Sequence, residues 1–82
     1  MMDNKYEIEL KIDEISSMIV RALIEERKRQ GYTQRTIAEN TGMHTSNVTR
    51  FESCKNTPSL DVLMRYANAL GKKIRIELVD KE

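Results

Sequence analysis

The chain has 82 residues, of which 39% are hydrophobic and 33% are charged, so we expect one small domain with a thin core. This composition is ordinary for a helical protein and argues against a disordered chain. One cysteine excludes an internal disulfide, and one cysteine with one histidine is too few for a structural zinc site, so no metal or cofactor is expected.

Charge is distributed unevenly along the chain. Residues 1–20 carry a net charge of −3, residues 21–75 carry +6 and residues 76–82 carry −2. A phosphate backbone responds to local charge, so the basic middle supports nucleic-acid binding. No apolar run is long enough to span a bilayer and no signal-peptide pattern opens the chain, which predicts a cytoplasmic protein with no membrane partner.

Residues 6–12 alternate apolar and charged side chains, a pattern that predicts a half-buried strand. A helix also fits this part of the chain, because isoleucines recur at spacings of three and four at Ile8, Ile12, Ile15 and Ile19. We prefer the strand because the alternation is strict, and the helix stays open as the alternative.

The first helix is predicted to begin near Asp13 or Ser16 and to run to about Gln30. Gly31 would end it, since glycine adopts a left-handed backbone at little cost. The side chains expected to face the core are Ile15, Met18, Ile19, Ala22 and Leu23.

Two short helices are predicted over about 34–40 and 45–53. Thr33 is a suitable N-cap for the first, His44 occupies the cap position of the second, and Gly42 permits the tight turn between them. The inward positions are Ile37, Ala38, Val48 and Phe51.

A last helix is predicted to begin after Ser59, which can cap it, and to end at Gly71. Its expected inner side chains are Leu60, Leu63, Met64, Ala67 and Leu70. Residues 73–79 then alternate apolar and polar side chains, which predicts a second strand.

Several landmarks recur together between about residues 19 and 71. They are Thr33-Gln34, Ile37-Ala38, Gly42, Val48, Phe51, Glu52, Pro58-Ser59-Leu60 and Ala69-Leu70-Gly71. In this register the chain resembles the lambda-repressor-like, or Xre-family, helix-turn-helix DNA-binding proteins. The expected fold is therefore mainly α: one four-helix domain over 1–82, with the helix-turn-helix at 33–53 and short terminal β-strands at about 6–12 and 73–79.

The resemblance implies roles for three groups of residues. The positions that would read base edges in the major groove are Thr45, Ser46, Asn47, Thr49 and Arg50. The positions that would contact phosphates are Thr33, Gln34, Arg35, His44, Ser53, Lys55 and Asn56. Arg27 and Glu52 match a partly buried structural ion pair.

The sequence departs from the family at two places. Cys54 stands where the family usually has glycine, so a left-handed backbone there would cost roughly 1 kcal/mol. After Gly71, residues 72–79 replace the fifth helix by which phage members dimerise. Such a tail is similar to those of HigA-like antitoxins.

One helix-turn-helix reads only a few base pairs, so we expect a homodimer on two half-sites of double-stranded DNA. The terminal strands are its expected interface. The preferred function is a sequence-specific transcriptional regulator, a repressor at an inverted-repeat operator. The alternatives are an antitoxin that also binds a toxin protein, and an interaction module that has lost DNA binding. No constellation of catalytic residues is present, so we expect no enzyme.

Overall fold

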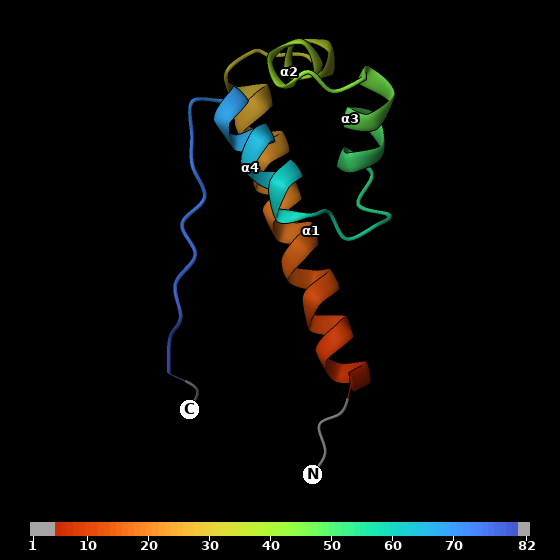
Figure 1. The fold of residues 1–82 in the computed structure, drawn as a ribbon, viewed down its shortest axis with the longest axis vertical. Coiled ribbons are helices and arrows are strands. Elements are labelled where there is room, and N and C mark those ends of the chain that lie inside the picture. Colours follow the sequence, from red (N-terminus) through yellow and green to blue (C-terminus); the bar gives the residue numbers. More distant parts are fainter. Residues whose placement is uncertain (1–4, 81–82) are drawn as a thin grey trace.

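The structure is a computed structural model that describes the backbone of residues 5–80 and the side chains of residues 11–80. Its four helices are α1 (Lys5–Arg29), α2 (Gln34–Thr41), α3 (Thr45–Glu52) and α4 (Leu60–Ala69). In Figure 1, α4 lies beside the second half of α1, and α2 and α3 lie near the C-terminal end of α1. The first half of α1 extends beyond the other helices, which gives the molecule its long shape of 47 × 24 × 20 Å.

The predicted N-terminal strand is wrong, because residues 6–12 form the first turns of α1. The helix consequently begins at Lys5 and not near Asp13 or Ser16. Each residue added to an existing helix gains a backbone hydrogen bond within its own segment, whereas a strand needs a neighbour to pair with. No strand lies among residues 5–80 to serve as that neighbour, so the three-four spacing of the isoleucines prevails over the alternation.

The predicted C-terminal strand is also wrong. Residues 73–79 have no regular secondary structure, although they follow an extended path (Figure 1). A single alternating segment cannot form a ladder by itself. Ile74 packs partly against the core, but Leu78 is fully exposed. We call residues 72–80, which follow the last helix and form no regular secondary structure, the tail.

The predicted starts of α2, α3 and α4 are confirmed, and their predicted ends lie within two residues of the observed ones. The Thr36 N–H donates to the Thr33 hydroxyl over 3.1 Å, and the Val62 N–H donates to the Ser59 hydroxyl over 3.2 Å. Each contact satisfies one of the amides that have no partner within the helix. Gly42 ends α2 in the left-handed conformation with φ 77°, which is the geometry that glycine accepts most readily.

The core contains side chains from all four helices. Its buried apolar members are Val20, Leu23, Ile37, Ala38, Val48, Phe51, Leu63, Tyr66, Ala67 and Leu70. The predicted inward positions of α2 and α3 are confirmed. The prediction for α1 was partly wrong, because Ile15, Met18 and Ala22 are exposed while Val20 is buried. In α4, Leu60 and Met64 are exposed and Tyr66 takes a central place.

Candidate nucleic-acid interface

The relative position of α2 and α3 depends on small and branched apolar residues. Ile37 and Val48 are fully buried, and the methyl side chain of Ala38 is nearly so. A small residue at position 38 lets the two helices approach closely, and a larger one would force them apart. These contacts fix the angle at which α3 presents its outer face.

The outer face of α3 carries the side chains that the sequence predicted as base readers. Thr45, Ser46, Thr49 and Arg50 are exposed and Asn47 is half-buried. Arg50 donates a hydrogen bond to the Asn47 side chain over 3.0 Å. This contact orients the guanidinium, whose paired donors suit the two acceptors on a guanine edge. The structure thus gathers all five residues on one short helix.

The predicted phosphate contacts fall at helix ends and in the loop after α3. Thr33 and His44 are the N-cap residues of α2 and α3, although the His44 side chain makes no capping hydrogen bond. Arg35 is exposed in the first turn of α2, where unpaired amides favour an anion. Three further members of this group follow α3 and are exposed: Ser53, Lys55 and Asn56.

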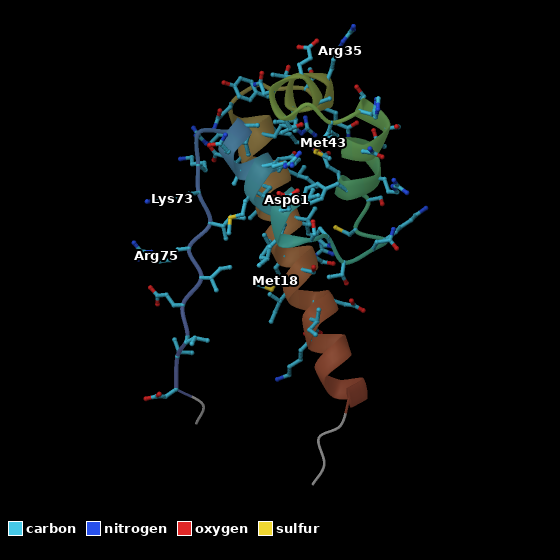
Figure 2. The ribbon with its side chains drawn as sticks, in the orientation of Figure 1. Met18, Arg35, Met43, Asp61, Lys73 and Arg75 are labelled. Carbon is cyan, nitrogen blue, oxygen red and sulfur yellow. The ribbon has the colours of Figure 1, made fainter. Side chains whose placement is uncertain are left out.

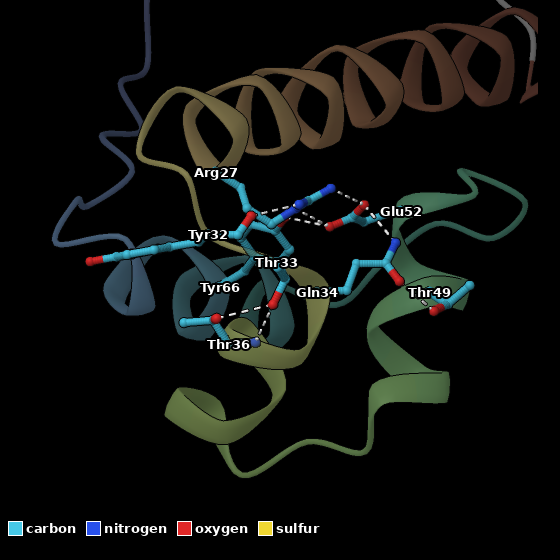
Figure 3. Close-up of polar contacts among 8 residues, drawn as sticks. All are labelled: Arg27, Tyr32, Thr33, Gln34, Thr36, Thr49, Glu52 and Tyr66. Atoms are coloured by element: carbon cyan, nitrogen blue, oxygen red, sulfur yellow. Dashed lines mark hydrogen bonds and ion pairs between the residues drawn. The ribbon is translucent and has the colours of Figure 1, made fainter.

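An ion pair ties α1 to the last turn of α3. Arg27 Nε donates to Glu52 Oε2 over 2.9 Å, and Arg27 Nη2 donates to Glu52 Oε1 over 3.1 Å (Figure 3). The two side chains are only 11% and 7% exposed. The third guanidinium nitrogen, Nη1, donates to the Tyr32 carbonyl over 2.8 Å. Each of the three guanidinium nitrogens of Arg27 therefore has a partner inside the protein.

Glu52 is the centre of a larger network that includes α2 and α4. Gln34 Nε2 donates to Glu52 Oε1 over 2.9 Å, and the Tyr66 hydroxyl donates to Glu52 Oε2 over 2.6 Å. The Thr49 hydroxyl in turn donates to Gln34 Oε1 over 2.7 Å. Figure 3 shows this chain of contacts running from α1 to the outer face of α3. Thr49 is a predicted base reader, so the network links the position of its side chain to α1, α2 and α4.

Burial and hydrogen bonding act in opposite directions on the pKa of Glu52. Burial raises the pKa, but hydrogen bonds from Tyr66, Gln34 and Arg27 outweigh it, so the pKa lies below its usual value. Burial and the hydrogen bond to Glu52 raise the pKa of the Tyr66 hydroxyl. Glu52 is consequently ionised and Tyr66 is neutral at neutral pH, which is the state in which every bond of the network can form.

Sequence reasoning did not find Tyr66 or the second role of Gln34. The tyrosine falls on the inner face of α4, where spacing alone suggests a ring in the core, and its ring does pack 5.0 Å from that of Phe51. A buried tyrosine hydroxyl needs a polar partner, so a tyrosine at an inner position of α4 was the signal in the sequence that a polar group lies nearby. The partner, Glu52, is fourteen residues away, and only the fold brings the two together.

Neither a membrane span nor a metal cluster is found in the described part of the chain. None of its helices is both long and apolar enough to cross a bilayer. Among residues 11–80, whose side chains the structure describes, no group of three or more His, Cys, Asp or Glu is placed to hold a metal ion. The site as described can offer hydrogen bonds and positive charge to a partner.

Comparison with known proteins gives one match. The family model described as Helix-turn-helix matches residues 23–76, which include α2, α3 and α4 and the end of α1. Neither the curated proteins nor the solved structures gave a match.

Proposed function

Because the chain belongs to the lambda-repressor-like, Cro/C1-type helix-turn-helix family and is thus a DNA-binding transcription regulator, we propose that it is a sequence-specific repressor. It binds an inverted-repeat operator as a homodimer and acts by occupying a promoter. The two half-sites lie about one helical turn apart, ~34 Å, since one recognition helix reads only a few base pairs.

The observation that carries the proposal is the outer face of α3. Four side chains with hydroxyl, amide or guanidinium groups stand exposed there, at Thr45, Ser46, Thr49 and Arg50. The opposite face of the same helix is fixed to the core by Val48 and Phe51 and to α1 by Glu52. A rigid helix with a polar, unburied face has the shape and the donors that the major groove requires.

Within this site we assign base reading to Thr45, Ser46, Asn47, Thr49 and Arg50. We assign phosphate contact to Thr33, Gln34, Arg35, His44, Ser53, Lys55 and Asn56, which lie at the helix N-termini and in the loop after α3. Gln34 already bridges Glu52 and Thr49. Its side-chain amide therefore positions a base reader, and its assignment to phosphate contact follows from its place at the start of α2.

The test compares binding of the protein to its own upstream DNA and to a random duplex across a salt series. Arg50→Ala should lose preference for the upstream site, because a bidentate contact to guanine is worth about 1–3 kcal/mol of discrimination. Lys55→Ala should weaken binding to both duplexes alike and reduce the salt slope by about one. Arg65→Ala is the matched control, since Arg65 is an exposed base on α4 that pairs with Asp61 over 3.1 Å.

Equal weakening of specific and non-specific binding by Arg50→Ala and Lys55→Ala would refute the division into readers and anchors. Absence of binding to any duplex at low salt would refute operator binding by this chain. It would favour a module that kept the fold without the DNA contacts.

A second candidate function is that of an antitoxin, which represses its own operon and also neutralises a toxin protein. The exposed apolar side chains of the tail, at Ile76, Leu78 and Val79, favour it, because a partner protein would bury them. Co-expression with the product of the neighbouring reading frame tests it. Formation of a stable complex that relieves growth arrest supports the antitoxin, and independent elution of the two proteins refutes it.

A further inference from the structure

An apolar stripe runs along the part of α1 that extends beyond the other helices. Ile12, Ile15 and Met18 are 47%, 56% and 64% exposed, and Ile19 is partly buried beside them. These positions follow one another at three- and four-residue spacings and so share one face of the helix. The buried Val20 and Leu23 define a neighbouring face, which is already occupied by the core.

A second pair of exposed apolar side chains lies on α4, which packs against α1. Leu60 and Met64 are exposed and lie one turn apart. Val62 lies between them in sequence and faces the other flank of α4, where it lines a hollow with Met43 and Phe51. Leu60 and Met64 therefore point away from the helix-turn-helix. Figure 2 shows Met18 on the side of α1 that faces the tail. We call Ile12, Ile15, Met18, Leu60 and Met64 the α1–α4 apolar surface.

The chain exposes more surface than a compact monomer of its size. Its accessible area is 6544 Å², whereas a compact protein of this mass exposes about 5,100 Å². Its radius of gyration is 14.3 Å, against about 12 Å for a compact domain of this length. The excess exceeds the roughly 800 Å² that each partner buries in a stable protein–protein interface. The extended shape thus offers enough area for a dimer.

The distribution of charge indicates that the partner of the α1–α4 apolar surface is a second copy of the same chain. Residues 5–14 of α1 carry two bases and four acids, while the first part of the tail, residues 72–76, carries three bases and its last part, residues 77–80, carries two acids. The tail turns back toward the N-terminal end of α1 (Figure 1). However, Ile76 is 63% exposed and Leu78 is fully exposed, so their side chains do not cover α1 of their own chain. A two-fold dimer in which residues 72–76 of each tail lie against the acidic first half of the other α1 would bring these opposite charges together.

We propose that the α1–α4 apolar surface is a homodimer interface, in which the stripes of two α1 helices pack together and each tail lies against the first half of the partner's α1. This inference rests on the homodimer of the proposed function and adds the surface that forms it. When two helices pack together, their side chains at three- and four-residue spacing interdigitate. The acidic and basic segments fix the relative direction of the two chains.

The first test measures the mass of the full chain in solution by sedimentation and light scattering, without DNA, over a concentration series. The wild type should approach twice the 9.6 kDa of one chain at micromolar concentration. Ile15→Glu and Met18→Glu should each raise the dimer dissociation constant at least tenfold, because an acidic group would be buried between the helices. Asn40→Glu is the matched control, since Asn40 is exposed on α2, and it should leave the mass unchanged.

Both test positions are exposed in the single chain, so neither substitution should prevent folding. Circular dichroism should show the same helix content for both variants and the control. Wild-type protein that stays monomeric at 100 µM, or a dimer that survives Ile15→Glu and Met18→Glu, overturns the proposal. Binding of a different protein to this surface with no self-association overturns it as well.

A charge exchange tests the role of the tail. Lys73→Glu/Arg75→Glu places acids opposite acids, and Glu14→Lys places a base opposite bases, so each variant alone should dimerise more weakly. Mixed together, the two variants should form a heterodimer of wild-type affinity, because both contacts then join opposite charges. A mixture no tighter than either variant alone would overturn the tail contact.

These experiments separate the interface from DNA binding. A chain that dimerises through this surface and binds no DNA keeps the interface and refutes the repressor. A chain that binds its operator while Ile15→Glu leaves both its mass and its affinity unchanged refutes the interface and keeps the repressor.

Discussion

Replacing Glu52 with alanine removes the acceptor of four hydrogen bonds at once. Two come from Arg27, one from Gln34 and one from the hydroxyl of Tyr66. The guanidinium of Arg27 would then retain only its contact with the Tyr32 carbonyl, in a place where its side chain is 11% exposed. The variant thus leaves a nearly buried cation without its counter-ion.

Removal of one partner from a buried pair costs about 3–5 kcal/mol. A protein of this length has a total free energy of unfolding of about 4–12 kcal/mol, so Glu52→Ala would remove a large part of it. Each kcal/mol shifts the melting temperature of a domain this small by about 4–8 °C. We therefore expect a fall of at least about 12 °C, followed by circular dichroism and by urea denaturation.

Two further variants make the result interpretable. Glu39→Ala removes an ion pair with Arg35 that is 3.7 Å long and exposed on both sides, so it should change stability by no more than about 0.5 kcal/mol. Arg27→Met combined with Glu52→Ala should recover part of the loss, because the unpaired charge is gone. If Glu52→Ala costs no more than Glu39→Ala, the pair does not hold α1 against α3 and the reasoning is refuted.

Three other changes test separate parts of the fold. Cys54 has φ 60°, so Cys54→Gly should raise the melting temperature. In urea denaturation its free energy of unfolding should exceed that of Cys54→Ala by about 1 kcal/mol; a glycine variant less stable than the alanine variant would contradict this. Tyr66→Phe keeps the ring but loses the hydroxyl donated to Glu52, which should cost about 1.5–3 kcal/mol; unchanged stability would show that the bond is not formed in solution. Hydrogen bonds from Arg29 and Gln30 lower the pKa of Glu26 to about 2, and the pKa of Glu52 is also lowered. Stability from these carboxylates is therefore present above the usual value of 4.5 and is lost as the pH falls through the lowered values; Glu52→Gln should make the acid-induced loss shallower, and an identical pH profile would contradict it.

Local signals in the sequence were sufficient for the short helices around the turn. Thr33 and Ser59 each provide a hydroxyl to an unpaired amide three residues later, and Gly42 accepts a left-handed backbone. These effects act within a few residues, so they operate wherever the segment is placed. Cys54 also has a left-handed backbone, which the resemblance to the helix-turn-helix family led us to expect.

Patterns that depend on a neighbour could not be resolved from the sequence. Residues 6–12 satisfy both a strand and a helix, and the choice fell to the helix because it pairs its backbone within the segment. The tail alternates as a strand does, but among residues 5–80 it has no strand to pair with. The exposed positions of Ile15 and Met18 likewise depend on which face of α1 the other helices cover.

The sequence by itself determined the helix-turn-helix, its caps and the residues of its outer face, because spacing and capping are local properties of the chain. The resemblance implied the pair of Arg27 with Glu52, but only the tertiary structure showed that Gln34 and Tyr66 also converge on Glu52. Four residues so far apart along the chain meet only when three helices have packed around α3. The physical reason is that a buried charge must find all its partners at once, and no local pattern records where those partners will come from.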